Sequence, residues 1–152
     1  MKLSENFSLA ELIKSDTAVR KSIDNNPDEV VTANLQALVD NILQPVRDTF
    51  GRVRVTSGYR SPLLNSSIGG SKTSHHCYGF AADFEVAGKD NKELAIWIRD
   101  NLKFTQLILE FYTEGDPNSG WVHCSYDAKD LKEQVLTATK VDGKTKYVTG
   151  IQ

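Results

Sequence analysis

Three histidines and one aspartate are the residues of this 152-residue chain best suited to chemistry. His75 and His76 are adjacent, and Asp83 follows in the same stretch. His123 lies far along the chain, in a segment typical of a strand. Two histidines and one carboxylate form the ligand set that catalytic zinc uses, with a fourth position open for water. Because such zinc activates water and polarises carbonyl groups, we predict a zinc site made of His76, Asp83 and His123.

The stretch after the second histidine has the spacing His76-x-x-Gly79-x-Ala81-x-Asp83. Gly79 lets the backbone turn so that the strand carrying Asp83 can approach, and the small Ala81 leaves room on the same face. This spacing favours His76 over His75 as the ligand, and we expect His75 to have a supporting role or to face solvent. Spacing alone fits surface histidines and a solvated carboxylate equally well.

Each of the two cysteines, Cys77 and Cys124, directly follows a proposed histidine ligand. A strand points successive side chains to opposite faces, so Cys124 should point away from His123. We therefore expect both thiols to be small core residues rather than zinc ligands.

Arg60 follows an expected strand, in the loop Gly58–Pro62. A guanidinium in that place could bind a carboxylate or a developing oxyanion. A structural arginine paired with a core carboxylate is the alternative, and the sequence by itself favours it.

The elements that must position these residues can be read from apolar periodicity and helix-capping signals. A long helix should begin near Asp28, be kinked or divided at Pro45 and end at Gly51. Shorter helices are expected at 8–15, 63–68 and 90–102, and strands at 53–57, 80–86, 106–111, 121–126, 134–141 and 144–148. Helices come first and antiparallel strands later, which predicts an α+β fold with amino-terminal helices packed on a mainly antiparallel sheet.

Length and composition predict one soluble globular domain spanning residues 1–152. The net charge of -2 argues against a nucleic-acid-binding surface. The first residues lack the apolar run of a secretory signal, and no later run is long enough to span a membrane. We therefore expect a cytoplasmic, monomeric protein that binds neither nucleic acid nor membrane.

Three motifs occur in order along the chain: Ser57-Gly-Tyr-Arg-Ser-Pro62, then Ser74-x-His76-x-x-Gly79-x-Ala81-x-Asp83, then Trp121-Val-His123-x-Ser125. Together they resemble the D-alanyl-D-alanine carboxypeptidase family of zinc peptidases. That family includes VanY- and VanX-like enzymes and L-alanoyl-D-glutamate endopeptidases of phage lysins, and hedgehog domains share its fold. The resemblance covers nearly the whole chain, and its amino-terminal helices are similar to those of small phage and prophage members.

The resemblance implies a role for each matching position. His76, Asp83 and His123 become the Zn²⁺ ligands, and Arg60 becomes the arginine that binds and polarises the scissile carbonyl. Ser74 falls on the motif's serine and is implied to contact the substrate or the ligands' surroundings. The implied substrates are peptidoglycan stem peptides, cut by activated water without a covalent intermediate.

The chain departs from the family at the general base. The family usually carries Glu or Asp three residues before the third ligand, where this chain has Gly120. Glu110 shares a strand face with Gln106 and Ile108, and some antiparallel registers would bring it near His123. Two further candidates lie in the following loop, namely Glu114 and Asp116. We choose Glu110.

Two functions follow. The first is a zinc metallopeptidase of phage or prophage origin that hydrolyses stem peptides, as a carboxypeptidase or an endopeptidase. Such a protein would be made in the cytoplasm and would reach the wall through a lysis pathway or within a virion. The alternative, suggested by Gly120, is a zinc-binding module that binds peptidoglycan or serves in a virion with little or no catalysis.

Overall fold

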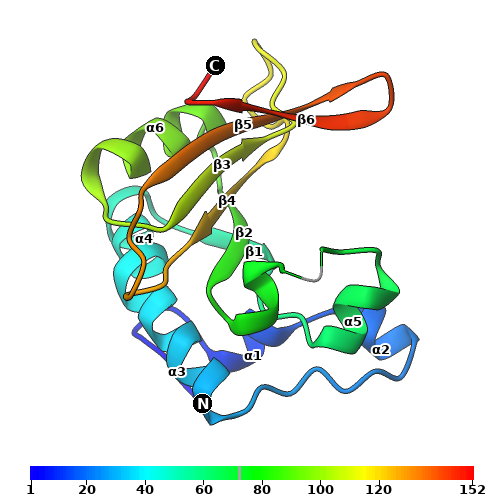
Figure 1. The fold of residues 1–152 in the computed structure, drawn as a ribbon. Helices are drawn as coiled ribbons and strands as arrows, with labels where there is room; N and C mark the ends of the chain where they lie inside the picture. The colour runs from blue at the N-terminus through cyan, green and yellow to red at the C-terminus, as the bar shows by residue number, and fades with distance from the viewer. Residues whose placement is uncertain (72) are drawn as a thin grey trace.

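A computed structural model describes residues 1–71 and 73–152 of the chain. Its centre is a six-stranded sheet with the order β1-β2-β4-β3-β5-β6 (Figure 1). The strands are β1 Val53–Ser57, β2 Ala81–Val86, β3 Gln106–Glu110, β4 Trp121–Ser125, β5 Gln134–Val141 and β6 Lys144–Thr149. Neighbouring strands are antiparallel except for the parallel pair β3 and β5. The predicted α+β class and mainly antiparallel sheet are confirmed.

The helices precede most of the sheet in sequence, and the longer ones cover one of its faces (Figure 1). They are α1 Leu9–Ile13, α2 Asp16–Arg20, α3 Glu29–Leu38, α4 Gln44–Phe50, α5 Pro62–Ser67 and α6 Asn91–Asn101, with the π-helical η1 Val39–Leu43 and the 3₁₀-helical η2 His75–Tyr78. Within the described part of the chain, no helix is both long and apolar enough to cross a membrane.

The long amino-terminal helix is divided, as predicted, but by a π-helical segment rather than a simple kink. Asp28 caps its start by accepting a hydrogen bond from the Val31 amide at 2.8 Å. The Gln44 amide then bonds back to the Val39 carbonyl, five residues earlier. Proline cannot donate to the helical ladder and its ring crowds the carbonyl four residues before it, so the wider π turn accommodates Pro45 at the start of α4.

The hydrophobic core lies between these helices and the sheet. Alternation along 80–86 predicts that Phe80, Ala82, Phe84 and Val86 face the core. Of these, Ala82, Phe84 and Val86 are buried. Phe80 is the exception, because it lies before β2, is half-buried and stacks on Tyr78. The opposite face of the sheet therefore carries the alternate residues, which include Asp83.

Two expectations need correction: the capping box that the Asp90-x-x-Glu93 spacing indicates at the start of α6, and the burial of Cys77. Asp90 caps α6 by accepting from the Lys92 amide at 2.8 Å, but Glu93 pairs with Lys89 instead of completing a capping box. Cys124 is buried as expected, whereas Cys77 is only half-buried. Cys77 lies on the short η2 turn rather than inside the sheet.

Candidate metal centre

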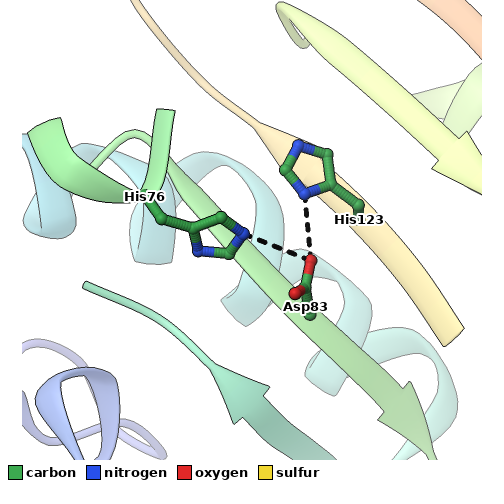
Figure 2. Close-up of side chains that lie close together, drawn as sticks. All are labelled: His76, Asp83 and His123. Atoms are coloured by element: carbon green, nitrogen blue, oxygen red, sulfur yellow. Dashed lines mark hydrogen bonds and ion pairs between the residues drawn. The ribbon is translucent and has the colours of Figure 1, made fainter. Parts of the chain in front are cut away.

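The register between β2 and β4 places Asp83 directly opposite His123. Directly opposed residues of an antiparallel pair project from the same face. His123 Nδ1 lies 2.9 Å from Asp83 Oδ1 (Figure 2). The two residues, forty positions apart in sequence, are thus joined on the face of the sheet that the helices leave open.

His76 reaches the same carboxylate from η2, which Ser74 caps through a 3.2 Å bond from the His76 amide. Gly79 ends η2 with φ of 77°, and a Cβ there would lie 2.8 Å from the Val31 carbonyl oxygen. The His76 side chain is 3% exposed. Its Nδ1 lies 2.7 Å from the Gly58 carbonyl oxygen, so Nδ1 carries the proton. Nε2 is left as a lone-pair donor toward Asp83.

These ligand atoms fit a divalent cation. His76 Nε2 lies 3.4 Å from Asp83 Oδ1, close to the separation of about 3.3 Å that two ligands have in a tetrahedral zinc site. The three candidate donor atoms lie within 4.8 Å of one another. Two neutral imidazoles and one carboxylate are the N and O donors that zinc accepts.

The electrostatics of Asp83 also favour a cation. Burial opposes its ionisation, but close contacts with His123 and His76 outweigh that effect and hold the pKa of Asp83 well below its usual range. Among the described residues, no lysine or arginine forms an ion pair with Asp83. A buried carboxylate needs a compensating partner, and a metal ion between the two histidines would supply it.

The three residues line an open pocket of about 500 Å³, together with Arg60, Ser74 and Glu110 and further residues of β3, β4 and β6. The pocket therefore gathers the candidate ligands and the candidate catalytic groups in one place.

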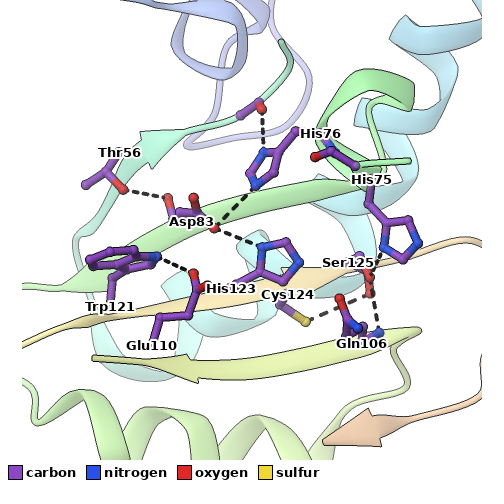
Figure 3. A network of polar contacts seen from close by, with 12 residues as sticks. Thr56, His75, His76, Asp83, Gln106, Glu110, Trp121, His123, Cys124 and Ser125 are labelled. Carbon is purple, nitrogen blue, oxygen red and sulfur yellow. Dashed lines mark hydrogen bonds and ion pairs between the residues drawn. The ribbon is translucent and has the colours of Figure 1, made fainter. Parts of the chain in front are cut away.

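Glu110 is the only one of the three candidate bases that lines this pocket within the described chain. The β3–β4 register sets it opposite Trp121, whose indole Nε1 donates to Glu110 Oε2 at 2.5 Å (Figure 3). Burial, followed by repulsion from Asp83, raises the pKa of Glu110. Glu114 instead pairs with Lys92 at 3.0 Å, and Asp116 accepts from the Asn118 amide within its own turn.

Gly120 cannot hold the acid that the family carries at its position. Its φ is 64°, and a Cβ there would overlap the carbonyl oxygen of Glu110. An acidic side chain at residue 120 would therefore push β3 and β4 apart. The feature of the sequence that indicates Glu110 as the base is therefore its place on the same face of β3 as Gln106 and Ile108, and not the position three residues before His123.

Arg60 extends into the pocket from the loop after β1. Its amide bonds to the His76 carbonyl at 3.1 Å, and its Nη2 lies 3.4 Å from Ser74 Oγ. Among the described residues it has no carboxylate partner within ion-pair distance, and its buried Nε has no hydrogen-bond partner. The predicted pairing with a core carboxylate is wrong, because the guanidinium instead lies beside Ser74, at the start of η2, and lines the pocket.

His75 has a supporting position. Its Nδ1 lies 3.0 Å from Ser125 Oγ, and the same hydroxyl accepts from the Gln106 amide at 3.1 Å (Figure 3). Burial, followed by the charges of His123 and Lys132, lowers the pKa of His75. The sequence did not reveal this bridge, nor Trp121 as the partner of Glu110, because both depend on strand register.

Comparisons with known proteins agree with the site. Residues 5–125 match the Peptidase M15 family. The chain is also 35% identical, over 108 residues, to a zinc D-Ala-D-Ala carboxypeptidase of Streptomyces albus G. That alignment covers 68% of this chain and 40% of the relative, so the chain spans well under half the relative's length. With four-fifths of its residues inside the family match, this chain belongs to the peptidase M15 family.

Proposed function

We propose that the protein is a zinc metallopeptidase that hydrolyses peptide bonds in peptidoglycan stem peptides. The observation that carries the proposal is one pocket holding His76, Asp83 and His123 together with Glu110. The name of the Streptomyces relative, which contains both zinc and D-Ala-D-Ala, supports the metal and the substrate class.

Zinc held by the three ligands would supply a water of lowered pKa and polarisation of a bound carbonyl. Glu110 accepts the proton of the attacking water at its carboxylate and later gives it to the leaving amine. Trp121 holds one Glu110 oxygen in place through its indole N–H, so the other oxygen is available for the proton. The raised pKa of Glu110 makes it a stronger base than an exposed glutamate.

Arg60 binds the scissile carbonyl oxygen as negative charge develops there. The guanidinium lines the pocket beside Ser74 and has no carboxylate partner among the described residues, so its terminal N–H groups are able to donate to a substrate. A donor already fixed in place stabilises developing charge without reorganisation. Ser74, which caps η2 and lies next to Arg60, acts by positioning both Arg60 and His76.

Metal analysis joined to mass spectrometry of digested peptidoglycan tests this function. The wild-type protein should bind one zinc ion and release stem-peptide fragments, and chelation should abolish release. Asp83→Ala should lose both zinc and hydrolysis, whereas Asp40→Ala, at an exposed residue of η1, should keep both. The masses of the products would identify a carboxypeptidase or an endopeptidase. Undiminished hydrolysis by metal-free protein would overturn the proposal.

The second candidate is a zinc-binding module that binds peptidoglycan without cleaving it. Gly120, in place of the family's acid, is the observation that favours this candidate. The same experiment distinguishes the two, because such a module would retain zinc and stem-peptide fragments but release no product.

A further inference from the structure

The last part of the chain builds one wall of the pocket. The family match ends at residue 125, yet Lys132 and Tyr147 line the same pocket as the metal triad. Lys132 precedes β5, and Tyr147 lies on β6. A part of the pocket therefore comes from residues beyond the family match. These residues can give this chain its own selectivity for substrates.

Strand pairing places Tyr147 on the same face of the sheet as Glu110, with β5 between them. Ala138 of β5 lies opposite Glu110 of β3, and Tyr147 of β6 lies opposite Ala138. Opposed side chains share a face of the sheet, so Glu110, Ala138 and Tyr147 form one row. Burial, followed by the charge of Glu110, raises the pKa of the Tyr147 hydroxyl. Ala138, between the two larger side chains, is fully buried.

Lys132 is held at the other end of this wall by its neighbours. The amides of Glu133 and Gln134 donate to the carbonyls of Phe104 and Thr105 at 3.1 and 3.0 Å. Glu133 adopts a left-handed φ of 52°, which turns the chain sharply into β5. The nearest carboxylate to the Lys132 ammonium is that of Asp130, at 3.9 Å and with both side chains about half exposed. So weak a pair leaves the ammonium able to take a ligand.

The pocket then has a cation on each side of the metal ligands. Arg60 follows β1 and Lys132 precedes β5, while β2, β4 and β3 lie between these two strands. The ammonium of Lys132 and the hydroxyl of Tyr147 are hydrogen-bond donors. A charged donor with only a weak partner, on the wall of the pocket, is suited to a carboxylate.

We propose that Lys132 is a subsite for a substrate carboxylate on the β5 side of the metal, with Tyr147 lining the other end of the same wall. The subsite selects peptides in which that carboxylate is free over peptides in which it is amidated. This inference rests on the proposed function, because it assigns the subsite to the same peptide substrate. A stem peptide offers two such groups, its terminal carboxylate and the α-carboxylate of its γ-linked D-glutamate.

Three synthetic pentapeptides of the sequence L-Ala-γ-D-Glu-L-Lys-D-Ala-D-Ala test the subsite. One has both carboxylates free, the second has a terminal amide, and the third has the glutamate α-carboxylate amidated. Lys132→Ala should raise KM about tenfold for the free peptide, the loss expected for a partly exposed charge-assisted hydrogen bond. It should have no effect on the form whose recognised carboxylate is amidated, which identifies the carboxylate. Lys132→Arg should keep the preference, because it keeps a charged donor at that position.

Lys129→Ala is the matched control, because Lys129 is an exposed lysine of the same loop that does not line the pocket. It should leave KM unchanged for all three peptides. If the wild type hydrolyses the peptides and Lys132→Ala shows the same KM values, the subsite is wrong and the proposed function stands.

Calorimetric titration of the same peptides into zinc-loaded protein gives a readout that does not need hydrolysis, with Glu110→Gln as the background. Dissociation constants should weaken about tenfold with Lys132→Ala, for the free peptide only. Should the wild type fail to hydrolyse any peptide, the proposed function fails, and this titration still decides the subsite. Equal affinities with and without Lys132, or no binding at all, would overturn it.

Discussion

Glu110 is a half-buried carboxylate whose hydrogen-bond partner is an indole rather than a cation. That environment suits a proton acceptor, because burial raises its pKa while the indole fixes its orientation. The ligands beside it are held differently, with His76 fixed by a backbone carbonyl and His123 opposed to Asp83. A mutation of Glu110 should therefore remove the base without removing the metal ligands.

Glu110→Gln should lower kcat by about 10²- to 10⁴-fold, the usual contribution of a general base. Zinc content should not change, since Glu110 is not among the three ligands. Steady-state kinetics on a stem peptide, with metal content measured on the same sample, provide the test. Glu114→Gln should have wild-type kcat, because Glu114 pairs with Lys92 outside the pocket. A Glu110→Gln variant with wild-type kcat would move the base elsewhere.

The raised pKa of Glu110 also predicts how stability depends on pH in metal-free protein. A carboxyl group whose pKa is raised by folding favours the folded state only while it is protonated. Its ionisation destabilises the fold as the pH rises above about 4.3, the pKa in the unfolded chain. Glu110→Gln should therefore unfold at a higher urea concentration than wild type at pH 7, and the difference should vanish near pH 4. An equal difference at both pH values would contradict the assigned pKa.

At the scale of elements, most of the site's framework could be predicted from sequence. The apolar repeat after Asp28, the alternation around Asp83 and the Asp142–Gly143 turn each depend on local chemistry, and each element was found. The same alternation and spacing identified the three candidate ligands, which the structure brings together.

Pairing between distant segments could not be predicted. The parallel pairing of β5 with β3 does not follow from the local sequence of either strand. Lys132 and Tyr147 were therefore missed as pocket residues. The partnership of Glu110 with Trp121 depends on a register that a slip of one residue would reverse.

Gly79 shows how an element positions a ligand. Alanine there would suffer from the left-handed φ and from a 2.8 Å approach to Val31. We expect Gly79→Ala to reduce the free energy of unfolding by about 2–4 kcal/mol, the range for a strained backbone combined with overpacking. Zinc affinity should fall as well, because η2 carries His76. Denaturant unfolding and zinc titration provide the measurements.

Gly88→Ala is the matched control for this substitution. Gly88 has a similar φ of 73°, but no atom lies within 4 Å of an added Cβ. Its cost should be about 1–2 kcal/mol, from the backbone alone, with zinc affinity unchanged. Equal effects of the two substitutions would show that packing of η2 against α3 does not matter.

At the scale of the whole molecule, the metal should link the η2 turn to two central strands of the sheet. Two of its ligands come from η2 and β2, which are neighbours in sequence, and the third comes from β4, forty residues after Asp83. Zinc at a hundredfold excess over its Kd should stabilise the fold by about 2.7 kcal/mol and raise Tm accordingly. Thermal unfolding with and without zinc would show this, and Asp83→Asn should abolish the shift. A zinc-dependent rise that survives in Asp83→Asn would place the ion at another site.

The central claim is that His76, Asp83 and His123 hold the catalytic metal. Anomalous diffraction at the zinc edge, from crystals grown with zinc, tests it most directly. We predict one strong peak within about 2.0–2.2 Å of His76 Nε2, an Asp83 carboxylate oxygen and His123 Nδ1. A fully occupied zinc bound elsewhere, with these three side chains bonded only to one another, would contradict it.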